Sequence, residues 1–157
     1  MGARVKFGDI IEIDTERGYA YAQYTHKDPM MGALIRVFKG FYPNGLKDFT
    51  NLIEQPTQFS TFFPLQRAVN IESVKIVGKK IPIRNDLKAF PVFRVGGLID
   101  PERKKTRSWS LWDGNEEIRI DQLTSHQKKL PIKATWNDTM LISRIENEWS
   151  PEKDITT

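Results

Sequence analysis

The residue types that most often carry out chemistry are few in this sequence and far apart. The two histidines, His26 and His126, stand a hundred residues apart, and neither has partners at metal-ligand spacing. The chain has no cysteine, so it has neither disulfides nor a thiolate, and it has no nucleophile elbow, phosphate loop or dinucleotide-binding glycine motif. Adjacent carboxylates such as Glu116 and Glu117 lie in hydrophilic stretches, where a solvated face is the simpler interpretation. The sequence therefore favours a non-catalytic protein without a metal or cofactor.

Charge is distributed unevenly along the 157 residues, whose overall net charge is +4. Residues 1–74 hold eight basic and eight acidic side chains and are neutral. Residues 75–107 hold ten basic and three acidic side chains, a net charge of +7, whereas residues 108–157 hold six and nine, a net charge of −3. Such asymmetry is consistent with an anionic partner but does not require one.

Aromatic residues within and beside the basic segment raise a nucleic-acid hypothesis. Lysines and arginines interleaved with Phe90, Phe93 and Trp109 could follow a phosphate backbone and stack on bases, as small barrels do on single strands. The other members of the run 89–95 are mostly apolar, however, so its two phenylalanines are expected in the core. Nucleic-acid binding is therefore the alternative function.

The opening stretch Gly8–His26 predicts a β-hairpin. Apolar and polar residues alternate on both sides of Gly18, which can supply a positive φ in the turn. The alternation places Tyr19 and Tyr21 on one face and Tyr24 on the other, as residues that build the sheet. A third strand, Gly32–Phe38, completes an antiparallel meander.

The remaining pattern predicts an α+β fold in one domain, residues 1–157, with a core over 7–149 and a flexible tail over 150–157. Its strand-rich body is the meander, which could close part of the way into a small barrel, with one short inserted helix and C-terminal helices. The predicted elements are a helix in Asp48–Gln55, an edge strand with or without a following turn in Gln58–Asn70, strands Ser73–Val77 and Ala89–Val95, and a hairpin of Ser108–Leu111 and Glu117–Ile120 around Asp113-Gly114. Two helices follow: one of a turn or two that begins at the capping box Thr124–Gln127, and one from Asp138 to Trp149.

The expected compartment is the cytoplasm. No apolar run approaches the roughly 18–20 residues that cross a bilayer. The N-terminal residues lack an apolar stretch of signal-peptide length, so we expect neither export nor membrane association.

A collinear series of short motifs resembles the immunity protein 26 family. The series covers roughly residues 7–149. It begins with a Gly-Asp-aliphatic-aliphatic-Glu-Ile strand, a Tyr-Ala-Tyr strand and a third strand ending in Val-Phe. Its members here are Gly8–Ile13, Gly18–Tyr24, Leu34–Phe38, Lys75–Gly78 with Ile81-Pro82, Phe90-Pro91 with Phe93, Trp112-Asp113-Gly114, Leu123, and Trp136 with Leu141 and Arg144-Ile145.

The resemblance implies a bacterial immunity protein of a polymorphic toxin system. Such a protein stays in the cytoplasm and neutralises a cognate toxin by binding it, without catalysis. Inhibitors that plug nuclease active sites are often acidic, whereas this chain is basic overall. Either the toxin's contact surface is acidic, or contact uses the C-terminal third of net charge −3, or the toxin is not a nuclease.

The predicted interface lies within residues 99–117. This region combines a charged loop, an acidic pair and a Trp-x-x-Trp strand, and two residues three apart on a strand point to opposite faces. One of those tryptophans is therefore expected to point away from the core, although a helix could still cover it, and aromatic residues are frequent at interface hot spots. The candidate contact residues are Arg103, Lys105, Trp109, Asp113, Glu116 and Glu117.

Overall fold

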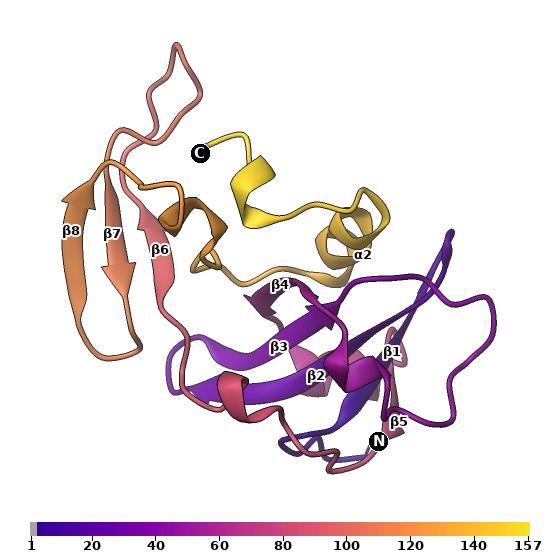
Figure 1. Ribbon diagram of the computed structural model, residues 1–157. Helices are drawn as coiled ribbons and strands as arrows, with labels where there is room; N and C mark the ends of the chain where they lie inside the picture. Colours follow the sequence, from indigo (N-terminus) through magenta and orange to yellow (C-terminus); the bar gives the residue numbers. More distant parts are fainter. Residues whose placement is uncertain (1–2) are drawn as a thin grey trace.

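The computed structural model describes residues 3–157 and consists of two antiparallel sheets with two short α-helices (Figure 1). The predicted α+β class is confirmed, and the sheets of the described chain do not close into a barrel. The first sheet has the order β4-β3-β2-β1-β5 and the second the order β6-β7-β8. Their strands are β1 (Ile10–Thr15), β2 (Gly18–Asp28), β3 (Gly32–Phe38), β4 (Thr57–Phe62), β5 (Lys75–Gly78), β6 (Phe93–Gly96), β7 (Trp109–Trp112) and β8 (Glu117–Asp121).

The N-terminal meander forms where the alternation predicts it, and β3 has the predicted bounds. In the β1–β2 turn, Thr15 Oγ1 donates to Gly18 O at 2.6 Å and accepts from Arg17 N at 3.1 Å. Gly18 has a φ of +117°, and a Cβ there would lie 2.9 Å from Tyr42 O. Only glycine satisfies both the backbone conformation and the close approach, which explains its position in the sequence.

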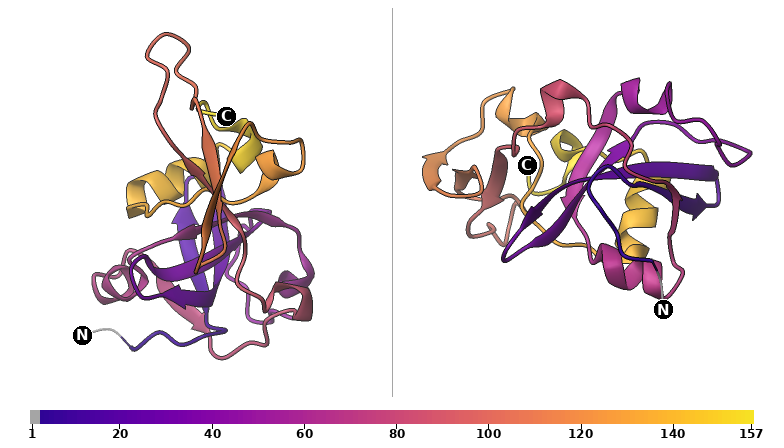
Figure 2. Two further views of the ribbon diagram at one scale, coloured as in Figure 1. Left: turned by 90° about the vertical axis from the view of Figure 1, so that its left-hand side faces the viewer. Right: turned by 90° about the horizontal axis from the view of Figure 1, so that it is seen from below.

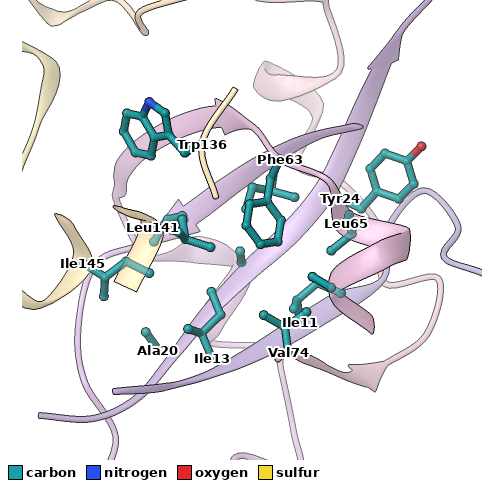
Figure 3. Packing of buried hydrophobic residues seen from close by; sticks show 14 of the residues in the cluster. Ile11, Ile13, Ala20, Tyr24, Phe63, Leu65, Val74, Trp136, Leu141 and Ile145 are labelled. Carbon is teal, nitrogen blue, oxygen red and sulfur yellow. The ribbon is translucent and has the colours of Figure 1, made fainter. Parts of the chain in front are cut away.

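Both faces of the first sheet are buried, and the tyrosines of β2 divide between them as predicted. Tyr24 faces the larger cluster, which packs under the helices α1 (Leu65–Asn70) and α2 (Asp138–Glu146) (Figure 3). Tyr21 faces the other way, in a cluster with the loop that contains the 3₁₀ turn η1 (Leu52–Glu54). The alternating tyrosines are thus part of the core rather than a binding surface.

Tyr21 is fully buried and hydrogen-bonded at its hydroxyl. The hydroxyl donates to Glu12 Oε2 and accepts from Leu46 N, both at 2.8 Å. Burial, reinforced by the bond to the Glu12 carboxylate, raises the pKa of Tyr21 from its ordinary value of 10.0 to about 12. The folded state therefore favours the neutral phenol.

We expect Tyr21 to be the last tyrosine to ionise in the folded protein. Its contribution to stability is complete below a pH of about 10 and is lost as the pH rises through about 12, because the unfolded chain ionises first. Phenolate absorbance during a spectrophotometric titration would reveal this late step. The Tyr21→Phe variant should lack it and the Tyr19→Phe variant should keep it. Ionisation of every phenol near the ordinary value would contradict the prediction.

Three predicted elements differ from the observed ones. Asp48–Gln55 contains only η1, because the Asp48 carboxylate accepts from Thr50 N and Oγ1 and so holds a turn rather than a helix. The strand predicted over Ala89–Val95 is reduced to β6 and follows the 3₁₀ turn η2 (Asn85–Leu87), since Pro91 cannot donate to a ladder. After edge strand β4, the segment up to Asn70 continues as α1.

The C-terminal third keeps its predicted capping box, but a 3₁₀ turn follows it instead of an α-helix, and α2 ends at Glu146 rather than at Trp149. Thr124 and Gln127 exchange the two capping-box hydrogen bonds, at 2.9 and 3.2 Å, before the 3₁₀ turn η3 (Gln127–Lys129). Residues 150–157, predicted as a flexible tail, instead pack against the body: they form η4 (Pro151–Lys153), in which Pro151 is buried and accepts a hydrogen bond from the Arg94 side chain. No helix in residues 3–157 is both long and apolar enough to span a membrane.

Candidate partner-binding surface

The second sheet is attached through one face and leaves one edge free. Phe93 and Trp112 pack on Leu34 and Phe62 of the first sheet, with ring centroids of Phe62 and Phe93 only 5.1 Å apart. In Figures 1 and 2 the sheet stands beside the first one, with β8 at its outer edge. Within residues 3–157, strand β8 pairs with β7 alone, so its other side carries backbone groups without a strand partner there.

The six predicted contact residues lie at two opposite ends of this sheet rather than on one surface. Arg103 and Lys105 belong to the loop 97–108, which joins β6 to β7 and projects at the top of Figure 1, with Trp109 at its base. The other three, Asp113, Glu116 and Glu117, belong to the β7–β8 hairpin at the lower end of the second sheet in that view.

Trp109 is not the exposed aromatic residue that the sequence predicts. Trp109 and Trp112 point to opposite faces, but both are buried, at 5% and 8% exposure. The Arg94 guanidinium covers the Trp109 ring at 4.8 Å, and Arg94 is itself held by the carbonyl of Pro151 in the C-terminal segment. The packing of residues 150–157, which was not predicted, therefore removes this tryptophan from the surface.

The β7–β8 turn fixes the acidic end of the sheet. Asp113 Oδ1 accepts from Asn115 N at 2.9 Å and Glu116 N at 2.7 Å, and these bonds hold the pKa of Asp113 below its usual range. Gly114 has a φ of +95°, and a Cβ there would lie 2.8 Å from the Phe90 ring. Asp113 is thus a turn-forming residue, and it directs the Glu116 and Glu117 region into solvent.

Residues 113–121, named here the acidic edge, form a strip of turn and strand that is exposed except at the half-buried Ile120. The strip holds four acidic side chains and one basic one, a net charge of −3. The basic one, Arg119, pairs with Asp121 at 2.6 Å, and both side chains are exposed. Ile118 is 62% exposed in the middle of the strip. Sequence alternation predicted the strand, but not Ile118 as a contact residue, because only the strand order reveals that β8 is an edge.

Cationic side chains gather around a pocket at the other end of the sheet, named here the basic pocket. Its volume is about 400 Å³. The lining residues are Asp100, Arg103, Lys105, Thr106, Arg107, Trp109, Gln122, Leu123, Lys128 and Thr157. Three of the six predicted contact residues, Arg103, Lys105 and Trp109, thus line one pocket. Lys128 was missed by sequence reasoning because its η3 segment is distant in the chain.

The histidines lie outside both sites. The His26 ring has Nε2 2.9 Å from Lys88 O, to which it donates, and Nδ1 2.9 Å from Thr25 Oγ1. His126 is exposed at the start of η3. Within residues 3–157, no group of three histidine, aspartate or glutamate side chains is placed to hold a metal ion.

Comparisons of the chain with protein-family models, with curated proteins and with solved structures found no match.

Proposed function

We propose that this protein is a cytoplasmic immunity protein that binds and neutralises a bacterial toxin without catalysis, and that the acidic edge is its contact surface. The motif series that resembles the immunity protein 26 family supports the class of protein. The observation that carries the choice of surface is the free edge strand β8, exposed along residues 117–119 with Ile118 at 62% exposure.

An exposed edge strand with an isoleucine is a liability unless a partner covers it. Its unpaired N–H and C=O groups can accept an extended segment of another protein, whose side chains then meet those of β8. Ile118 lies opposite Leu111 of β7, which is half-buried, so the two side chains form an apolar contact point beside the edge. Backbone pairing would supply affinity, and the flanking charges would supply selectivity.

Charge complementarity defines the kind of partner. The strip of net charge −3 fits a toxin domain with a cationic face, such as one that handles nucleic acid. This answers the difficulty raised by the basic overall charge: the acidic excess of the C-terminal third is gathered in part on one exposed edge. Contact through the acidic edge would place carboxylates at the cationic positions where such a toxin binds the phosphates of its substrate.

The alternative function, nucleic-acid binding through stacked aromatics, has less support. Phe93 is fully buried and Trp109 is covered by Arg94. Phe90 packs against His26 and Trp112, with ring centroids 5.6 Å away in both cases. The aromatic side chains that interleave the basic segment therefore face inward, where they cannot stack on bases.

Co-expression tests the proposal. The gene next to the one encoding this chain should encode a toxin domain, and producing that domain alone should stop growth. Producing both proteins should restore growth, and the two should purify as a stoichiometric complex. A toxic neighbour that this protein neither binds nor neutralises would refute the function.

Reversing charge on the acidic edge should weaken the toxin complex. We expect the Glu116→Lys/Glu117→Lys double variant to bind roughly 100-fold less tightly, because two attractive contacts become repulsive. Titration calorimetry measures the affinity, and growth rescue reports the consequence. The matched control, Glu54→Lys/Glu72→Lys, makes the same change in net charge at exposed positions outside the edge. Equal loss in both variants would show that the edge is not the contact surface.

A further inference from the structure

The loop that forms one wall of the basic pocket is ordered by its own backbone hydrogen bonds. Its two limbs pair through Gly97 N with Ser108 O and Arg107 N with Leu98 O, at 2.9 and 2.8 Å. Its tip closes through Asp100 N and Lys105 O at 2.6 Å, and its base is tied to the C-terminal segment by Thr106 N and Thr156 O at 2.9 Å. These bonds hold the charged side chains of the loop over one fixed hollow.

Four cationic side chains line this pocket from separate parts of the chain. Arg103, Lys105 and Arg107 come from the loop, and Lys128 comes from the separate segment η3. In residues 3–157 the salt bridges of arginine involve Arg17, Arg84, Arg119 and Arg144, and none of the four pocket cations forms an ion pair or a side-chain hydrogen bond. Four unpaired cations that converge on one pocket repel one another, so an anion bound there would be favoured.

Asp100, the acidic residue of the pocket lining, forms hydrogen bonds within the loop. Asp100 Oδ1 accepts from Glu102 N at 2.9 Å and from Arg103 N at 3.2 Å. Its carboxylate stabilises the turn that presents Arg103, and it attracts Arg107 and Arg103 without forming an ion pair with either. The pocket therefore keeps an excess of positive charge, with Thr106 and Gln122 as neutral polar groups and part of the Trp109 and Leu123 side chains as an apolar wall.

We propose that the basic pocket binds a ligand carrying two or more phosphate groups. Two guanidinium groups can each meet phosphate oxygens through paired N–H donors, and two ammonium groups supply point charges from separate segments. A volume of about 400 Å³ holds a diphosphate or a nucleotide end. Glu116 and Glu117 lie at the opposite end of the second sheet from this pocket, whereas Asp121, the last residue of the acidic edge, pairs with Trp109 of the pocket lining.

Titration of the full chain with inorganic pyrophosphate at low ionic strength tests this site. Calorimetry should give saturable one-to-one binding that weakens as salt is added. The indole N–H resonance of Trp109 should shift in step, because this side chain is in the pocket wall. Absence of saturable binding, or binding that leaves the Trp109 resonance unmoved, would overturn the proposal. Citrate binding as tightly as pyrophosphate would overturn the choice of phosphate.

Matched variants separate the pocket from the general positive charge of the protein. Lys105→Gln/Lys128→Gln removes one cation from the loop and one from η3 and should weaken pyrophosphate binding by roughly tenfold or more. Lys75→Gln/Lys79→Gln removes the same charge from exposed positions on and after β5 and should change it by no more than about twofold. Equal weakening in both would mean a diffuse charge effect and would refute the site.

Competition identifies the source of the phosphate. If the natural ligand is a free small molecule, adenosine diphosphate or pyrophosphate should bind more tightly than a short single-stranded oligonucleotide. If it is the end of a nucleic acid, the oligonucleotide should bind more tightly and displace pyrophosphate. In either case the Lys105→Gln/Lys128→Gln variant should lose binding, and an oligonucleotide that binds this variant as tightly as the parent protein would refute the site for nucleic acid.

Discussion

Replacing Phe62 with alanine should lower the free energy of unfolding by about 3–5 kcal/mol, the usual range for a fully buried phenylalanine. Phe62 is 0% exposed and is the residue of edge strand β4 that enters the cluster shared by the two sheets. Its ring stacks on Phe93 at 5.1 Å and meets Trp112 at 6.1 Å. A cavity at this point removes contacts from both aromatic residues that attach the second sheet.

The effect of Phe62→Ala should be concentrated in the second sheet. Chemical denaturation gives the total loss, and hydrogen exchange shows where protection falls; we expect the amides of β6 and β7 to lose most. Phe59→Ala is the matched control, because Phe59 is equally buried on the opposite face of β4 and contacts Trp136 and Trp149 instead. That variant should lose stability without a selective loss in β6 and β7. The same exchange pattern in both variants would contradict this account of how the sheets are joined.

The meander was predictable because its signals are local. Alternation over Gly8–His26 fixes which residues share a face, and Gly18 marks a turn that no other residue fits. The same holds for the Asp113-Gly114 hairpin and the Thr124–Gln127 capping box, where residues a few positions apart bond to each other. What was not predictable depends on distant contacts. The C-terminal segment is placed by Arg94 and Thr106, more than forty residues earlier in the chain.

In the candidate sites, too, local features could be predicted from the sequence, whereas features that depend on distant contacts could not. The region 99–117 was predicted as exposed and charged, which holds for its charged residues but not for β7, whose two tryptophans are buried, and it was treated as one surface. Strand β7, which is four residues long, lies between Lys105 and Glu116 in the chain. Because the two residues are at opposite ends of this strand, the basic loop and the acidic turn lie at opposite ends of the sheet. Lys128 and Ile118 can be identified as candidate binding residues only from the folded structure. The first lines the pocket from another segment, and the second lies on a strand whose edge position depends on the strand order.

Arg36→Met should be the most destabilising substitution of a charged residue, at about 2–4 kcal/mol. Arg36 is 2% exposed, and each of its three nitrogens donates a hydrogen bond. Nε donates to Thr57 Oγ1 at 2.6 Å, Nη1 to Ile53 O at 3.3 Å and Nη2 to Gln55 O at 2.6 Å. These bonds anchor the loop after η1 to the sheet, and methionine would leave all three acceptors without this donor. Burial lowers the pKa of Arg36 to about 10, so the desolvation that methionine relieves offsets part of the loss.

Arg94→Met is the matched comparison and should cost under about 1 kcal/mol. Arg94 is as deeply buried, but its Nε and Nη1 have no hydrogen-bond partner in the described protein, and only Nη2 donates, to Pro151 O. Methionine would preserve contact with the Trp109 ring and would remove two unsatisfied donors. The nearby Asp154 carboxylate would keep Arg144, at 3.5 Å. Denaturant midpoints of the two variants test the contrast, and equal losses would show that burial of the cation, rather than the partners of its N–H groups, decides the stability.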